Sequence, residues 1–359
     1  MNRALIRLAA LGAVVALGGA ACSSDSEDAA VGDPAATVAA DCDNIGDPNV
    51  VTVYSGRSEK LVKPLLDQID ESVLGPGISV EVFYDQKPVK ILEEGPRSPA
   101  DVWFGQDAGE LGALAKHGYL GQLPDSVTGL VPASYVDPDK RWTATTLRSR
   151  VLAYDPAQVP EAELPAGIDA LVDNAAPGTI GYAPTNASWK SFVTALRVLR
   201  GEDGAREWLT KFKEAEPTEF ANNGAVLDAV DQGQVKFGLI NHYYWFQRTA
   251  SVGAENVKAN IHYFKGDTEP GALVNIAAAG ILNCSNSAEA AGKLVQFLLS
   301  EESQQYFADQ TGEYPVIEGV QSKHALPALT ELDPPTIDLN QLESLEATEA
   351  LLRETGLLE

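Results

Sequence analysis

The segment Phe237-Gly-Leu-Ile-Asn-His-Tyr-Tyr-Trp245 is the stretch around which the rest of the chain can be organised. Its apolar run 237–240 is typical of a buried strand, and the run ends at polar Asn241. Ligands of open α/β sheets bind in the crevice beyond the strand ends. The segment therefore predicts an α/β fold in which Tyr243 and Tyr244 sit just past the end of a strand and face a ligand crevice.

The two adjacent phenols are the strongest candidate for a chemical site. Composition alone favours a plainer interpretation, in which both rings are walls of a cleft. A phenol has an unperturbed pKa near ~10, so only a strong Lewis acid holds two of them as phenolates at neutral pH. Trivalent iron is such an acid. Tyr243 and Tyr244 are therefore candidate ligands of Fe(III).

Length and charge limit the classes of protein to consider. The 359 residues are enough for two domains of ordinary size, and a hydrophobic content of 45% supports buried cores. The net charge is −25, from 51 acidic and 26 basic residues. This balance argues against a nucleic-acid partner or an anionic membrane surface. It suits a cationic ligand, although many secreted proteins are acidic.

The N-terminal region has the features of an export signal. Residues 1–21 combine arginines, a short apolar run and small residues, which predicts a secretory signal peptide. Cys22 follows directly, as in bacterial lipoprotein signals, where this cysteine is lipidated. Residues 22–47 are expected to form an acidic, flexible tether. With Cys22 assigned to lipid, Cys42 and Cys284 remain as an even pair, which predicts a disulfide in an exported chain.

The order of predicted elements gives the fold class. Beginning at Val51, β-rich runs at 51–55, 78–83 and 101–104 alternate with helical patterns at 60–71 and 89–94. This alternation predicts a parallel sheet with helices on both faces. Further helices are expected at 190–199, 204–213, 225–232, 287–299 and 303–310, a strand at 272–282, and a C-terminal packing helix over 339–352.

Several polar residues indicate an anion site. In an extended segment Arg148 and Arg150 project from the same face, where they either pair with carboxylates or grip an anion. Asn186 and Ser188 lie at the start of the expected helix 190–199, where free amide groups favour an anion. Helix capping alone would explain both residues. Two arginines and two polar helix starts around one crevice are more than capping requires.

An enzyme is the alternative of another class. A metal-dependent hydrolase would show a cluster of His and carboxylate residues or an activated nucleophile. The sequence contains no HExxH, P-loop, GxSxG or CxxC motif. We therefore expect no enzymatic activity.

Several segments together carry a resemblance to a known family. In order along the chain they are Thr52-Val-Tyr-Ser-Gly-Arg57, Glu93-Glu-Gly-Pro-Arg-Ser-Pro-Ala-Asp-Val102, Arg148-Ser-Arg150, Gly181-Tyr-Ala-Pro-Thr185 and Leu239-Ile-Asn-His-Tyr-Tyr-Trp245. They look like segments of the ferric-ion-binding substrate-binding proteins of bacterial iron ABC transporters. The resemblance runs from about Val51 to Leu357. Its Arg-Ser-Pro-Ala-Asp and Asn-x-Tyr-Tyr-Trp segments are specific, whereas many solute-binding proteins share the opening strand.

The resemblance implies a periplasmic-binding-protein fold. Two α/β lobes would be joined by hinge strands, with the ligand cleft between the lobes. It places residues 48–146 and 275–322 in an N-terminal lobe and residues 147–274 in a C-terminal lobe. Residues 323–359 would be a helical tail that packs on the lobes.

The resemblance also implies the ligand set. Tyr243 and Tyr244 match the family's iron ligands. Asn223 and Asn241 match positions that help hold a synergistic anion, carbonate or phosphate, near the helix start at Asn186 to Ser188. Arg148 or Arg150 would take the place of an anion-pairing arginine.

The chain departs from the family on the side of the first lobe. Ser58 stands where some members have a histidine ligand, and Gln106, with Asp107 beside it, stands where they have a glutamate. Trp189 replaces a third tyrosine of other members. Fe(III) prefers six hard donors, so anion, water, Gln106 or Glu59 would complete the shell. Such a site also suits a ferric chelate, such as iron with citrate.

The resemblance finally implies partners and location. The protein would be a monomer outside the cytoplasm, anchored to the membrane by lipid on Cys22, and would deliver its ligand to an ABC permease and its ATPase. An alternative keeps the receptor role but changes the cargo. An aromatic box of Trp103, Phe104, Trp189 and Trp245 would then bind an organic cation or another small solute.

Overall fold

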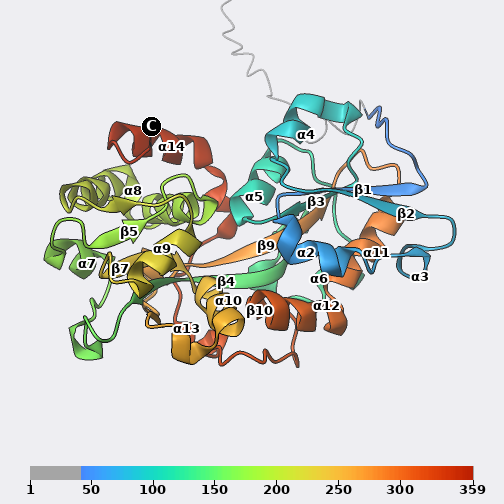
Figure 1. Ribbon diagram of the computed structural model, residues 1–359. Coiled ribbons are helices and arrows are strands. Elements are labelled where there is room, and N and C mark those ends of the chain that lie inside the picture. Colours follow the sequence, from blue (N-terminus) through green and yellow to red (C-terminus); the bar gives the residue numbers. More distant parts are fainter. Residues whose placement is uncertain (1–41, 359) are drawn as a thin grey trace, which may run out of the picture. The chain divides into compact units, whose positions relative to one another are not determined.

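The structure is a computed structural model that describes residues 42–358, and these form a mixed α/β fold (Figure 1). The strands are β1 (Val50–Ser55), β2 (Ser79–Phe83), β3 (Val102–Gly105), β4 (Thr143–Tyr154), β5 (Ile180–Tyr182), β6 (Thr218–Glu219), β7 (Phe237–Asn241), β8 (Asn260–His262), β9 (Val274–Ile281) and β10 (Tyr314–Pro315). The helices are α2 (Glu59–Leu66), α3 (Glu71–Leu74), α4 (Val89–Glu94), α5 (Ala108–Lys116), α6 (Asp125–Thr128), α7 (Ile168–Asn174), α8 (Ala187–Glu214), α9 (Asn223–Asp231), α10 (His242–Val252), α11 (Ala288–Leu298), α12 (Glu301–Tyr306), α13 (Leu329–Leu332) and α14 (Leu345–Glu354). A 3₁₀ turn, η7 (Leu339–Glu343), precedes α14.

The strands form a continuous path in the order β2-β1-β3-β9-β4-β7-β5-β6. Strands pair in parallel near both ends of this path, as the alternation of strands and helices predicts. In the middle, β9 is antiparallel to β3 and to β4, and β4 is antiparallel to β7. The sheet is therefore mixed, with parallel pairs near its ends and antiparallel pairs at its centre.

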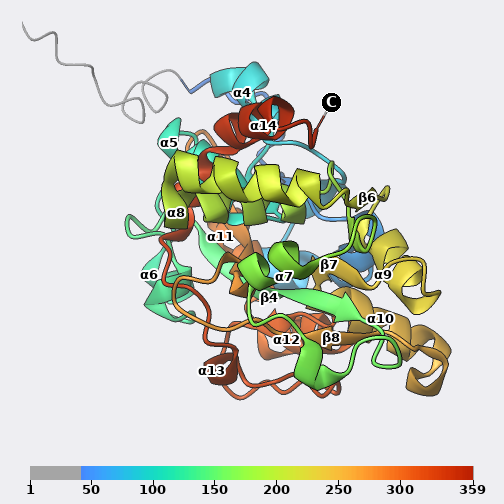
Figure 2. The ribbon, with the colours of Figure 1, turned by 90° about the vertical axis from the view of Figure 1, so that its left-hand side faces the viewer.

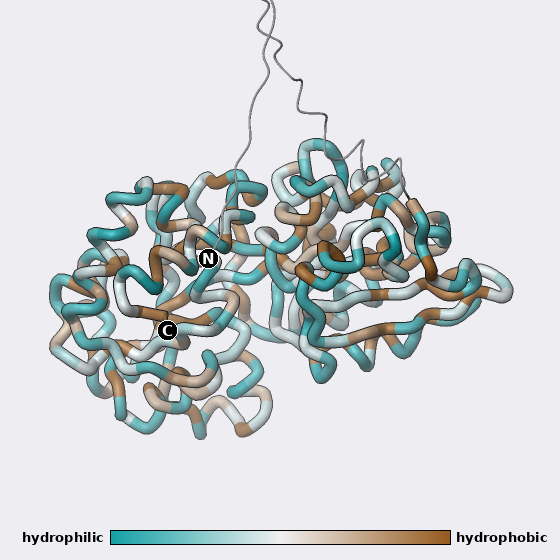
Figure 3. The backbone as a smooth tube through the Cα atoms, turned by 90° about the horizontal axis from the view of Figure 1, so that it is seen from above, coloured by the Kyte–Doolittle hydropathy of each residue, from teal (hydrophilic) through white to brown (hydrophobic). Residues whose placement is uncertain are grey.

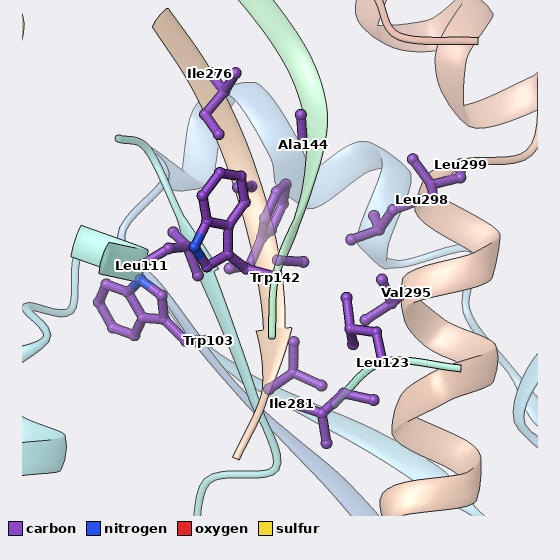
Figure 4. Packing of buried hydrophobic residues seen from close by; sticks show 14 of the residues in the cluster. Trp103, Leu111, Leu123, Trp142, Ala144, Ile276, Ile281, Val295, Leu298 and Leu299 are labelled. Atoms are coloured by element: carbon purple, nitrogen blue, oxygen red, sulfur yellow. The ribbon is translucent and has the colours of Figure 1, made fainter. Parts of the chain in front are cut away.

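The apolar residues gather in separate cores. The first core contains side chains of β1, β3, β9, α5 and α11, and Figure 4 shows Val295 and Leu298 of α11 directed toward the strands. Trp103 and Trp142 are fully buried there. The second core packs α8 against β5 and β7, and a smaller cluster under α9 covers the other face of these strands. We call the parts built around these cores the first and the second lobe.

Strand β4 passes from one lobe to the other. Its residues Thr143 to Ser149 pair with β9, whereas Arg150 to Tyr154 pair with β7. All 12 residues of the strand are buried. The change of partner between Ser149 and Arg150 places the predicted arginine pair at the crossing.

Two helical predictions differ in detail from the structure. The two helices expected at 190–213 are segments of α8, which is broken at Gly201, where φ is +74°. The single helix expected over 339–352 is wrong, because η7 ends at Glu343 and α14 begins at Leu345. Leu339 and Leu342 pack in the first core but Leu351 and Leu352 in the second, so one straight helix cannot reach both.

Near the N-terminal end of the described chain, Cys42 and Cys284 form a disulfide with their Cα atoms 5.2 Å apart. Cys22, the predicted signal peptide and most of the predicted tether lie outside the described residues.

Hydrophobic and hydrophilic residues are interspersed along the described chain (Figure 3). Within residues 42–358, no helix is both long and apolar enough to cross a membrane.

Candidate metal and anion site

Helix α10 presents the two candidate phenols. Strand β7 ends at Asn241 and the helix begins at His242, so Tyr243 and Tyr244 lie in its first turn and not in extended chain. Their rings are stacked, with centroids 4.5 Å apart and planes 27° apart. Tyr243 is 4% exposed and Tyr244 is half-buried. The helical turn therefore brings both phenols to one place.

The environment keeps Tyr243 protonated in the absence of a ligand. Burial raises the pKa of Tyr243 well above its ordinary value, and the neighbouring Tyr244 raises it further. The guanidinium of Arg148 acts in the opposite direction. A group that binds here as a Lewis acid must displace this proton.

His242 fixes the start of α10 against β4. Its Nδ1 accepts a hydrogen bond from the backbone N–H of Ser149, 3.1 Å away. The side chain is fully buried, and this burial lowers the pKa of His242 to about 4. The imidazole is therefore neutral at physiological pH, and it ties the tyrosine helix to the strand that carries the arginines.

A polar network lies beside the phenols at the start of α8. Arg150 donates from Nη1 to Ser188 Oγ (3.2 Å) and from Nη2 to the carbonyl of Leu239 (2.8 Å). Asn223 Nδ2 also donates to Ser188 Oγ (2.9 Å), which donates to Asn186 Oδ1 (2.6 Å). Asn186 caps α8, and Asn223 is the first residue of α9. The predicted residues Arg150, Asn186, Ser188 and Asn223 thus form one cluster.

Part of the hydrogen-bonding capacity of this cluster is unused. Within residues 42–358, Nε of Arg150, Nη1 of Arg148 and Oδ1 of Asn223 are buried without a hydrogen-bond partner. Burial lowers the pKa of Arg150 to about 9, while the phenol groups of Tyr243 and Tyr244 oppose that change. Buried N–H groups without partners cost free energy. An anion between the two guanidinium groups would satisfy them.

Asn241 and Arg148 complete the central part of the site. Asn241, which is 4% exposed, lies opposite Arg150 in the β4–β7 ladder. Arg148 lies opposite Asn275 in the β4–β9 ladder. The two arginines therefore belong to pairings in different lobes, although only one residue separates them.

On the first-lobe side, Asp107 makes the contact that sequence reasoning did not find. It caps α5, and its Oδ2 accepts hydrogen bonds from Asn275 Nδ2 (2.6 Å) and from Ser191 Oγ of α8. Arg148 Nη2 lies 3.6 Å from the same oxygen. Asp107 thus links the lobes next to the phenols. No local pattern announces Ser191, which is an interior residue of a helix.

Arg57 and Glu313 form a buried ion pair near Arg148. Arg57 Nη2 lies 2.6 Å from Glu313 Oε2, and both side chains are almost fully buried. Although burial by itself would raise the pKa of Glu313, the guanidinium groups of Arg57 and Arg148 hold it below its usual range. Glu313 is therefore an anion that partly balances the positive charge of Arg148.

Gln106 and Glu59, the first-lobe residues predicted as metal ligands, make no contact with the cluster of Arg150, Asn186, Ser188 and Asn223 among the described hydrogen bonds. Gln106 is half-buried and donates its backbone N–H to Glu110 Oε2 (3.0 Å). Glu59 is exposed and lines a surface pocket with Lys63 and Asp85. Across residues 42–358, no cluster of three or more His, Cys, Asp or Glu side chains could hold a metal ion.

The aromatic box is wrong for most of its predicted members. Trp103 and Phe104 are fully buried in the first core, and Trp189 is fully buried in the second. The Trp189 ring packs on Phe192 and other aromatic side chains of α8. These rings fill cores because β3 and α8 each turn an apolar face inward, so they cannot line a cleft.

Comparisons with known proteins show the family of the chain. The model of a family described as bacterial extracellular solute-binding protein matches residues 97–344. The chain is 31% identical over 313 residues to the major ferric iron-binding protein of Neisseria meningitidis serogroup B, covering 86% of this chain and 93% of the relative.

Solved structures show the same fold. Iron-bound HitA from Pseudomonas aeruginosa has a TM-score of 0.78 and 33% identity, and the match covers 86% of this chain and 99% of HitA. The Trichodesmium protein IdiA (FutA), in complex with iron and citrate, has a TM-score of 0.71 and 25% identity, with coverage of 86% and 99%. A two-lobe fold shared over almost the whole length of these relatives, together with the family match, shows that the chain belongs to the bacterial extracellular solute-binding proteins.

Proposed function

We propose that this protein captures Fe(III) between its lobes, together with a synergistic anion, and delivers it to an ABC permease and its ATPase. The stacked, largely buried pair Tyr243 and Tyr244 beside two arginines is the observation that carries the proposal. The names of its relatives support ferric iron as the cargo. In this proposal residues 48–146 and 275–322 form one lobe, residues 147–274 the other, and residues 323–359 the tail.

The charges of the site explain why an anion should accompany the metal. Two buried guanidinium groups, those of Arg148 and Arg150, would repel a trivalent cation bound to the neighbouring phenolates. An anion that accepts their free N–H groups removes this repulsion and supplies oxygen ligands. Binding of the metal and binding of the anion therefore favour each other.

We assign the anion to the polar cluster formed by Arg148, Arg150, Asn186, Ser188, Asn223 and Asn241. Carbonate and phosphate are both compact enough to lie at the start of α8, where backbone N–H groups and the helix dipole favour negative charge. Gln106, Glu59 or water would complete the coordination shell from the first lobe when the lobes close.

A ferric chelate is a second candidate cargo. The complex of the Trichodesmium relative with iron and citrate favours it, as do the unused N–H groups of the two arginines. The two cargoes differ in one measurable way. At a fixed free iron concentration and with carbonate present, citrate should increase iron binding if the chelate is the cargo, whereas capture of the bare ion with carbonate predicts no effect of citrate.

Addition of ferric iron with bicarbonate or citrate tests the proposal directly. A visible phenolate-to-iron charge-transfer band should appear, weaken in Tyr243→Phe or Tyr244→Phe, and vanish in the double variant. Tyr182→Phe is the matched control, because this buried phenol bonds Glu219 in the second lobe (3.0 Å) and should leave the band intact. A band that survives the double substitution, or no band in the native protein, would refute the assignment.

We also propose that lipid on Cys22 anchors the protein outside the cytoplasm. Metabolic labelling with a radioactive fatty acid should mark the native chain but not Cys22→Ser. The proposal fails if both proteins are labelled equally or if neither is labelled.

A further inference from the structure

The chain near its C-terminus packs on both lobes. Its first half, η7, contributes Leu339 and Leu342 to the first core, and its second half, α14, contributes Leu351 and Leu352 to the second. Figures 1 and 2 show α14 lying along α8. We call residues 339–354 the C-terminal strap.

The first half of the strap is seated closely on α5. A Cβ added to Gly109 would lie 2.4 Å from the carbonyl oxygen of Leu342, and one added to Gly112 would lie 3.1 Å from that of Asn340. Asn340 Oδ1 also accepts a hydrogen bond from Trp142 Nε1 (3.2 Å). Only glycine leaves room for backbone to approach the helix this closely.

The joint between the two halves is held by α8. Arg197, which is 9% exposed, donates from Nη1 to the carbonyl of Ser344 (2.9 Å), to Ser344 Oγ (3.0 Å) and to Thr348 Oγ1 (2.8 Å). The hydroxyl groups of Thr194 and Thr348 are 2.7 Å apart. The strap is therefore bonded to α8 at the point where it leaves α5.

Between α5, α8 and the strap lies a pocket of roughly 360 Å³, lined among others by Asp107, Glu110, Ser191 and Leu345. The two helices are therefore not packed solidly against each other here. They meet through the hydrogen bond of Ser191 to Asp107 and through the strap. This leaves space for α5 and α8 to move relative to each other.

We propose that the C-terminal strap limits how far the two lobes separate. Opening about strand β4 would move α5 away from α8, and the strap would resist because η7 is seated on α5 and α14 on α8. It keeps Asp107 close to Ser191, beside the candidate site. The consequence for cargo rests on the proposed function: weakening the joint should speed iron release about tenfold, within the usual range of coupling between sites.

The lobe separation can be measured without any cargo. Spin labels on Glu81→Cys and Glu255→Cys, which are exposed residues of different lobes, report the separation by pulsed electron resonance. Arg197→Met removes the hydrogen bonds of Arg197 to Ser344 and Thr348 but keeps an apolar stem and the contact between Thr194 and Thr348. It should widen the ligand-free distance distribution toward longer distances. Arg206→Met is the matched control, because Arg206 pairs α8 with Glu354 of α14 beyond the joint, and should leave the distribution unchanged.

A second variant covers the case in which Arg197→Met does not fold. Thr348→Val removes one acceptor of the joint, is nearly the same size and keeps the Arg197 charge, so it should fold and give a smaller shift in the same direction. Unchanged distances in a folded Arg197→Met or Thr348→Val protein would overturn the proposal. If the distances widen but iron produces no band in any variant, the strap stands and the proposed cargo falls.

Discussion

Tyr243 and Tyr244 show how position in a helix turns two ordinary phenols into a candidate metal site. The first turn of α10 stacks their rings, and Arg148 and Arg150 lie close enough to act on their charges. The raised pKa of Tyr243 means that iron must compete with a proton at every physiological pH.

Iron affinity should therefore fall in acid. Each phenol that loses a proton on binding makes the affinity fall about tenfold per pH unit, so two phenols predict a fall of about a hundredfold per unit below neutrality. Tyr243→Phe removes one of these protons and should reduce the slope to about tenfold. Titration with a competing chelator from pH 7.5 to 5.5 measures both slopes. Protonation of the anion contributes equally to both slopes, so the difference between the slopes reports Tyr243 alone. Equal slopes would contradict the role of Tyr243.

Glu110 should make the free energy of unfolding depend on pH. Burial, followed by the nearby Asp107, raises its pKa to about 7 from an ordinary value of 4.5. The folded state therefore binds this proton more tightly than the unfolded state, and the resulting stabilisation is lost as pH rises from about 4.5 to 7. Glu110→Gln should remove this loss and stabilise the protein at pH 8 by on the order of 1 to 3 kcal/mol. Urea unfolding at pH 5 and pH 8 measures the effect; a variant that is less stable at pH 8 would contradict it.

At the scale of elements, replacing a helical glycine by alanine should change stability in opposite directions at two positions. Gly109→Ala in α5 should destabilise the fold by about 1 to 3 kcal/mol, because the new Cβ meets the backbone of η7. Gly292→Ala in α11 has only Ile281 Cδ1 at 4.0 Å and should stabilise by up to about 1 kcal/mol through helix propensity. Urea unfolding compares them. Equal changes in the free energy of unfolding in the same direction would mean that η7 does not pack closely against α5.

The sequence predicts most strands and helices because their apolar periodicity is local. Strands β1 to β3 and helix α4 lie close to the positions that their patterns indicate. The start of α10 is missed because His242 and the aromatic residues after it have only weak helix propensity. The break at Ser344 is missed because leucine spacing does not reveal that two different cores receive the leucines.

The candidate site likewise contains residues that local sequence predicts and contacts that it does not. Asn186 and Ser188 can be found from local sequence because capping residues act on their own helix. The contact of Asp107 with Ser191 joins positions 84 residues apart, and Glu313 reaches Arg57 across 256 residues. No local pattern encodes such pairs, so they become visible only in three dimensions.

For the whole molecule, the disulfide closes a loop with a sequence separation of 242 residues between Cys42 and Cys284. Closing so long a loop restricts the unfolded chain, and its loss should lower the free energy of unfolding by about 2 to 5 kcal/mol. Urea unfolding of the oxidised protein, of the reduced protein and of the double variant Cys42→Ala, Cys284→Ala measures this. The reduced and doubly substituted proteins should agree, and stability equal to that of the oxidised form would contradict the prediction.

Strand β4 changes its pairing partner between Ser149 and Arg150, so Arg148 and Arg150, which carry the two guanidinium groups, lie on either side of that change. Any twist at that peptide alters the spacing of two positive charges at the same moment as it alters the angle between the lobes. If the lobes turn at this point, the angle between them and the electric field in the crevice would change together. A bound anion that fits only one charge spacing would select one angle, even without touching the rest of either lobe.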